Sequence, residues 1–233
     1  YLNWHWVYFI LTILYLALTL IIYKNVPESP YKKPDLKLLK FFNNFKDFGQ
    51  NLKVLYSLFI SLTLLIMFIS MYSILNSYIT SNKVGGDMSV ASVVKLFGVI
   101  GMFLSLLVGR LSGRLGTKRV LTLALSTCVV SLILMGTFTN IVLITIFSVT
   151  FVAGIAFAIP TVISKVGVVV NSNQGFFLSV NTVILFLGTA IAPILMIYVK
   201  QIPNFFLEFL TIAMIGVLAV IVSIFMPNDH HVN

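Results

Sequence analysis

The sequence is poor in charge, cysteine and histidine. Only 9% of its 233 residues are charged, against about a quarter in an ordinary soluble domain, and 59% are hydrophobic. The one cysteine, Cys128, lies inside an apolar run, which excludes an internal disulfide and a cysteine metal cluster. This composition excludes a soluble globular domain and predicts an integral membrane protein.

The membrane segments also lack the groups that intramembrane enzymes use. Such enzymes need paired carboxylates, a serine with a histidine, or histidine and glutamate metal ligands within the membrane. No apolar run here holds paired carboxylates, and the three histidines, His5, His230 and His231, lie near the chain ends. We therefore expect no enzyme activity, no metal and no cofactor.

Seven apolar runs are long enough to cross a bilayer as helices. A hydrocarbon core of about 30 Å needs about 20 apolar residues in helical form, because lipid offers no partner to an unpaired backbone group. We predict an all-α membrane protein with seven transmembrane helices. The runs cover residues 5–23, 54–79, 92–112, 119–138, 141–164, 176–199 and 205–226.

The one long polar stretch separates the first run from the second. It contains three prolines followed by a lysine-rich part. Apolar residues recur there at helical spacing, which predicts a helix lying on the membrane surface; the alternative is an unstructured tether. That spacing is carried by Phe41, Phe45, Phe48 and Leu52.

The net charge of +9 reports orientation, since the basic residues lie between the apolar runs. If the runs alternate sides, 12 of the 15 Lys and Arg residues fall on one side, and Lys83, Lys95 and Lys200 fall on the other. The positive-inside rule then makes the long linker and the C-terminal tail cytoplasmic. We expect a multi-pass protein of the cell membrane, and no nucleic-acid partner.

A short basic segment joins the third run to the fourth, and it reads Gly109-Arg-Leu-Ser-Gly-Arg-Leu-Gly-Thr-Lys-Arg-Val-Leu121. Glycines favour a tight turn and close helix approach. The segment resembles the loop motif of the major facilitator superfamily, G-x-L-x-D-R-x-G-R-K-R, in the copy between helices 8 and 9. Gly113 stands where the family has Asp, and Thr117 where a basic residue is usual. The matching residues are Gly109, Leu111, Arg114, Gly116, Lys118 and Arg119.

Two further features agree with this register. The long linker falls where the family joins its two six-helix halves. Residues 171–175 and the run after them are similar to the family's turn into helix 11 and its G-x-x-x-G-P pattern, with Ala192 in place of the second Gly. The residues that carry this second similarity are Ser179, Asn181, Gly188, Ala192 and Pro193.

The resemblance implies a domain organisation. Residues 1–24 would be helix 6 of the N-terminal half, 25–53 the cytoplasmic linker, 54–226 the C-terminal six-helix bundle and 227–233 a cytoplasmic tail. The bundle would consist of two three-helix units related by an inverted repeat. The expected partners are the N-terminal half of the same transporter, the lipid bilayer and a small-molecule substrate.

The resemblance also implies secondary active transport by alternating access. Similarity to the family's drug and sugar efflux branch implies proton-coupled export of a small amphipathic molecule. Since no acidic residue lies near the centre of a run, the coupling carboxylate is expected in the other half. A nonconducting membrane receptor or structural protein is the alternative.

Polar residues inside the runs are the candidates for a cavity wall. Tyr72, Asn76 and Asn181 are the groups that we place there, with helix-to-helix hydrogen bonding as the alternative for each, and Lys95 is a further candidate. Lys95 is expected to extend to the outer headgroups, or otherwise to face the cavity. Glu208 lies near the outer end of its run, where we expect interfacial solvation.

The loop motif is expected to act on conformation. In the family this position helps to hold the outward-open state through contacts between helix ends, so Arg114 is expected to bond helix-end carbonyls in one state only. The alternative is that the cations only fix topology. The residues concerned are Gly109, Leu111, Gly113, Arg114, Gly116, Lys118 and Arg119.

Overall fold

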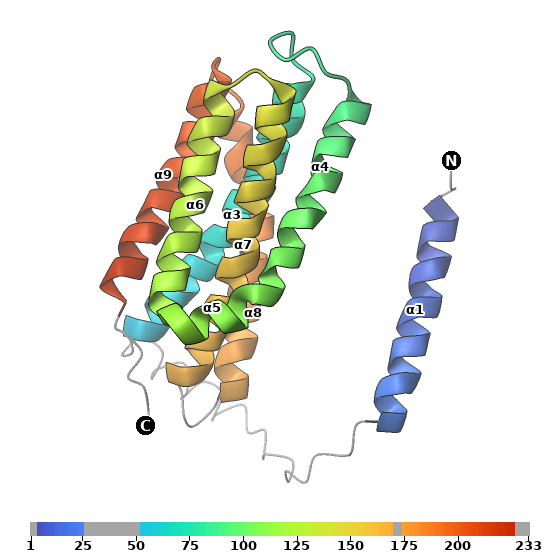
Figure 1. The fold of residues 1–233 in the computed structure, drawn as a ribbon, viewed down its shortest axis with the longest axis vertical. Helices are drawn as coiled ribbons and strands as arrows, with labels where there is room; N and C mark the ends of the chain where they lie inside the picture. Colours follow the sequence, from blue (N-terminus) through green and yellow to red (C-terminus); the bar gives the residue numbers. More distant parts are fainter. Residues whose placement is uncertain (1–3, 26–51, 170–173, 227–233) are drawn as a thin grey trace. The chain divides into compact units, whose positions relative to one another are not determined.

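The computed structural model describes residues 4–25, 52–169 and 174–226. These residues form eight α-helices and one short 3-10 helix, shown in Figure 1. The chain divides into two units, residues 1–46 and 47–233. The helices are α1 (Trp4–Asn25), α3 (Leu52–Ile79), α4 (Met88–Phe103), η1 (Leu104–Leu107), α5 (Val108–Leu115), α6 (Thr117–Thr137), α7 (Ile141–Val169), α8 (Gln174–Val199) and α9 (Phe205–Phe225).

The seven predicted spans are confirmed among the described residues. Seven helical stretches are long and apolar enough to cross a membrane, and the third of them combines α4, η1 and α5. The predicted surface helix over residues 41–52 lies outside the described residues except for Leu52, the first residue of α3. Residues 171–173 of the expected turn into helix 11 also lie outside them.

Helix α1 forms the described part of the first unit. It is apolar all round, and its side chains from His5 to Asn25 are exposed within this chain. The hydroxyls of Thr12 and Thr19 are hydrogen-bonded within the helix, because each donates to the carbonyl one turn earlier at 2.8 Å. Such a helix suits a lipid or protein environment on every side.

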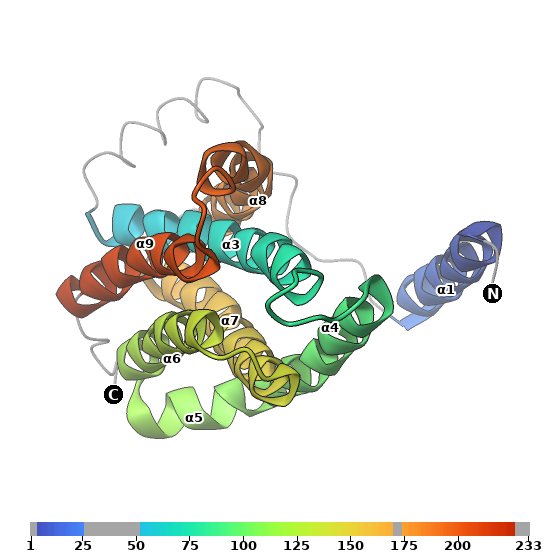
Figure 2. The ribbon, with the colours of Figure 1, turned by 90° about the horizontal axis from the view of Figure 1, so that it is seen from above.

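The six spans of the second unit pack in pairs that repeat. Helix α8 packs on α3 as α4 packs on α7, and α9 packs on α3 as α6 packs on α7 (Figure 2). Exchanging α3 with α7, α4 with α8 and α6 with α9 therefore reproduces the main contacts. This pairing agrees with the inverted repeat expected of two three-helix units.

Two glycines stand on equivalent helices of this repeat and allow a close approach of backbones. A Cβ on Gly188 of α8 would lie 2.6 Å from the Leu62 carbonyl oxygen of α3. A Cβ on Gly101 of α4 would lie 2.6 Å from the Val149 carbonyl oxygen of α7. Small residues are needed at both crossings, because membrane helices associate through close packing of their backbones.

The connection between the third and fourth spans differs from the predicted short turn. Helix α4 gives way to η1 at Leu104, and α5 then runs along the outer edge of the bundle next to α6 (Figures 1 and 2). Most of the basic motif is therefore helical. The chain reverses at Gly116 alone, whose φ of +82° favours glycine.

Candidate functional site

Lys95 and Tyr72 form a contact between α4 and α3. The Lys95 ammonium lies 6.0 Å from the centre of the Tyr72 ring, a cation–π distance, and both side chains are half-buried. Phe68 meets the same ring edge-on, with centroids 5.1 Å apart. The ammonium is thus directed toward the Tyr72 ring on α3.

Glycine at position 98 allows this contact. A Cβ on Gly98 would lie 2.5 Å from the Tyr72 hydroxyl oxygen, so the ring occupies the space that a side chain on α4 would fill. Lys95 lies one turn before Gly98 on the same helix. The helix pair therefore positions the ring under the ammonium by packing alone.

Lys95 has no carboxylate partner among the described residues. Asp87 caps the start of α4, where its Oδ1 accepts from the Val90 amide at 2.8 Å. Asn76, one turn after Tyr72 on α3, is half-buried, and its side-chain amide has no hydrogen bond in the described part of the chain. Tyr72, Asn76 and Lys95 therefore make a polar strip, with a cation and an amide open to an external partner.

Asn181 does not belong to this polar strip. It is fully buried on α8, and its Oδ1 accepts a hydrogen bond of 2.7 Å from Ser61 Oγ on α3. This buried hydrogen bond agrees with the helix-to-helix alternative for Asn181, and its placement on the cavity wall stays a prediction. Its Nδ2 has no partner among the described residues.

Glu208 is not solvated as expected. It lies in the first turn of α9, after the N-cap Asn204, and is only 4% exposed. Its Oε2 has no hydrogen-bond partner among the described residues. The reason is that α9 packs against both α3 and α6, so a position in the first turn of the helix is still buried.

The basic motif lies on an open surface. Arg114 and Arg119 are exposed, Lys118 is half-buried, and within the described part none of them bonds a helix-end carbonyl. The expected Arg114 contacts are thus not formed in this conformation. Added Cβ atoms at Gly109 and Gly113 would meet nothing within 4 Å, so these glycines do not bring helices together here. Leu111 is exposed and Gly116 half-buried.

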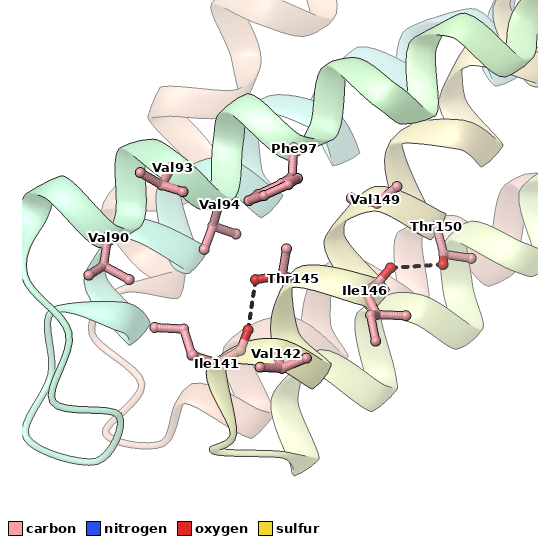
Figure 3. A pocket seen from close by; sticks show the side chains of 10 residues that line it. All are labelled: Val90, Val93, Val94, Phe97, Ile141, Val142, Thr145, Ile146, Val149 and Thr150. Carbon is pink, nitrogen blue, oxygen red and sulfur yellow. Dashed lines mark hydrogen bonds between the residues drawn. The ribbon is translucent and has the colours of Figure 1, made fainter.

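Sequence reasoning missed an apolar groove between α4 and α7, shown in Figure 3. It encloses about 580 Å³. Its two hydroxyls are occupied within α7, since Thr145 donates to Ile141 and Thr150 to Ile146. The groove therefore presents hydrocarbon only, and no chemically distinctive residue type could have revealed it. The lining residues are Val90, Val93, Val94, Phe97, Ile141, Val142, Thr145, Ile146, Val149 and Thr150.

Comparison with known proteins adds two findings. The sequence model of the Major Facilitator Superfamily matches residues 1–193. The fold is similar to the crystal structure of a mutant of the peptide transporter POT in complex with alafosfalin, with a TM-score of 0.66 and 20% identity. That match covers 73% of this chain and 37% of the transporter's length. No curated protein matches the sequence.

Proposed function

The chain belongs to the Major Facilitator Superfamily, and we propose that it supplies the C-terminal half of a secondary active transporter. In this proposal residues 54–226 rock against a matching N-terminal half, to which α1 belongs, and expose a central site to each side of the membrane in turn. The transported molecule is small and amphipathic, and its export is coupled to protons.

The polar strip of Tyr72, Asn76 and Lys95 is the observation that carries this proposal. A lysine inside a membrane span is costly unless it faces a partner or a water-filled cavity. Here the cation–π contact holds the ammonium above an aromatic ring, and the described residues offer it no carboxylate. A cavity between two halves supplies water and substrate to such a group, whereas hydrocarbon does not.

The same polar strip indicates what kind of molecule fits. Aromatic rings at Phe68 and Tyr72 present apolar faces, while Lys95 and Asn76 present hydrogen-bond donors. This combination suits an amphipathic molecule with a polar or acidic end. A peptide substrate does not follow from the fold similarity, because at 20% identity the similarity concerns the fold alone.

The coupling carboxylate lies outside the polar strip in this proposal. Of the two acidic residues that the structure describes, Asp87 is engaged at the start of α4 and Glu208 is buried beside α3 and α6. Neither is placed to exchange a proton with a substrate at Lys95. The proton site is therefore assigned to the N-terminal half.

Transport by the intact protein tests this function. Everted vesicles would carry an acid interior reported by acridine orange, and ethidium and a thiogalactoside would be added in turn as amphipathic and sugar-like probes. We expect at least one probe to dissipate the proton gradient, and Lys95→Gln to lower that response about tenfold at equal expression. If no probe moves protons, coupled export is refuted. Uptake of a probe without proton movement would support transport and refute its coupling to protons.

A further inference from the structure

The last part of the third span, helix α5, has the character of an interfacial helix. Helix α5 follows α4 through η1 and bends away from the axis of α4, along the outer edge of the bundle (Figures 1 and 2). Val108 is buried against the bundle, whereas Leu111 and Leu115 remain 37% and 40% exposed. Arg110 and Arg114 lie one turn apart and are exposed. The helix thus carries an apolar edge beside a cationic edge.

Four cations gather where α5 meets α6. Arg110 and Arg114 are followed by Lys118 and Arg119 in the first turn of α6. Within the described residues none of the four has an ion pair, and both described acidic residues lie at the other end of the bundle, near the starts of α4 and α9 (Figure 1). This end therefore has a local positive charge that its own described neighbours do not balance.

The surface around these cations is open. Gly109 and Gly113 are exposed, and a Cβ at either position would touch nothing within 4 Å. The motif therefore does not form a helix contact within this bundle. A ligand can reach the guanidinium groups from the side of α5 that faces away from the bundle.

We propose that α5 and the first turn of α6 bind the headgroup of an anionic phospholipid. Charge complementarity and position carry this choice. The cations stand directly at the end of a membrane span, where phosphodiester groups of the leaflet lie, and clustered Lys and Arg next to a span attract anionic lipids. Arginine fits phosphate through paired N–H donors. Leu111 and Leu115 would then enter the acyl region beside that headgroup.

Lipid retention tests the site on the intact protein. Binding of phosphatidylglycerol and of phosphatidylcholine is measured by native mass spectrometry for Arg110→Gln/Arg114→Gln and for a matched control, Lys83→Gln/Lys200→Gln, which removes two cations from the other end. We expect the first pair to lose affinity for phosphatidylglycerol about tenfold or more and the control to keep it. Unchanged binding in the arginine pair, or equal losses in both pairs, would overturn the proposal.

Helix depth provides a second test that keeps both arginines. Spin labels are placed at Leu111 or Leu115, and at Gly109 or Gly113, in a Cys128→Ser background reconstituted with phosphatidylglycerol. We expect the leucine positions to collide with oxygen and the glycine positions with a water-soluble nickel chelate. Water exposure at all four positions would place α5 outside the interface and refute the lipid site. Burial from both reagents would instead assign the surface to a protein partner and equally refute it.

Discussion

Replacing Gly188 by alanine should separate the helices that the bundle depends on. The added Cβ would lie 2.6 Å from the Leu62 carbonyl oxygen and 3.3 Å from the Ile66 nitrogen, both backbone atoms that cannot rotate away. Overpacking of this kind costs about 1–3 kcal/mol, while alanine gains about 0.5–1 kcal/mol over glycine in a helix. We therefore expect Gly188→Ala to lower the free energy of unfolding by about 0.5–2 kcal/mol.

The matched control is Gly113→Ala. An added Cβ there meets nothing within 4 Å, so only the helix propensity changes. We expect this variant to be as stable as the parent or more stable by about 0.5–1 kcal/mol. Only Gly188→Ala should thus lower the stability, although both substitutions replace glycine in a helix.

Cys128 offers the readout for this pair. It is the one cysteine of the sequence and is 0% exposed, so a thiol-reactive dye reports unfolding on heating. We expect Gly188→Ala to lower the midpoint by about 1–8 °C, taking about 2–4 °C per kcal/mol. An unchanged midpoint for Gly188→Ala, or a larger loss for Gly113→Ala, would refute the assignment of packing roles to the glycines.

Three further expectations concern the polar residues. Ser61→Ala and Asn181→Ala should show a coupling free energy of about 0.5–1.5 kcal/mol in a double-mutant cycle of unfolding. Additive effects of the two substitutions on the free energy of unfolding would show that the two side chains share no hydrogen bond. Lys95→Gln should lower the transport rate about tenfold, because one charged interaction is lost, and Lys95→Arg should keep most of the parent rate. Normal transport by Lys95→Gln would show that Lys95 extends to the lipid headgroups instead. Arg114→Ala should lower the transport rate several-fold with substrate affinity unchanged, whereas Lys83→Ala should leave the rate at the parent level; normal transport by Arg114→Ala would leave only a topological role.

The spans could be predicted from the sequence because one property decides them. A run of about 20 apolar residues must be helical in lipid, and all seven runs are helices of the expected length in the described residues. The break after Phe103 could not be predicted in this way. The four residues of η1, Leu-Ser-Leu-Leu, are as apolar as the helix before them, so hydropathy does not distinguish a straight span from one that turns.

The candidate site was predictable in residue type but not in direction. Tyr72 and Lys95 meet because α4 approaches α3 at Gly98. The hydropathy of the sequence does not show which helices pack together or on which face. Asn181 is polar in the same way, yet it turns to Ser61 because α8 packs on α3. Glu208 is buried because α9 has neighbours on two sides. Helix packing therefore decides which polar groups face a cavity.

Water access to the polar strip tests the central claim most directly. A single cysteine is placed at Tyr72, seven residues before the C-terminal end of α3, or at Met214, which is 64% exposed and lies nine residues after the start of α9, in a Cys128→Ser background. A membrane-impermeant thiol reagent is then applied to the intact protein in its membrane. A cavity between two halves predicts rapid modification at Tyr72→Cys and none at Met214→Cys. Equal protection of both cysteines would show that lipid or packed protein covers the polar strip, and would contradict the transport cavity.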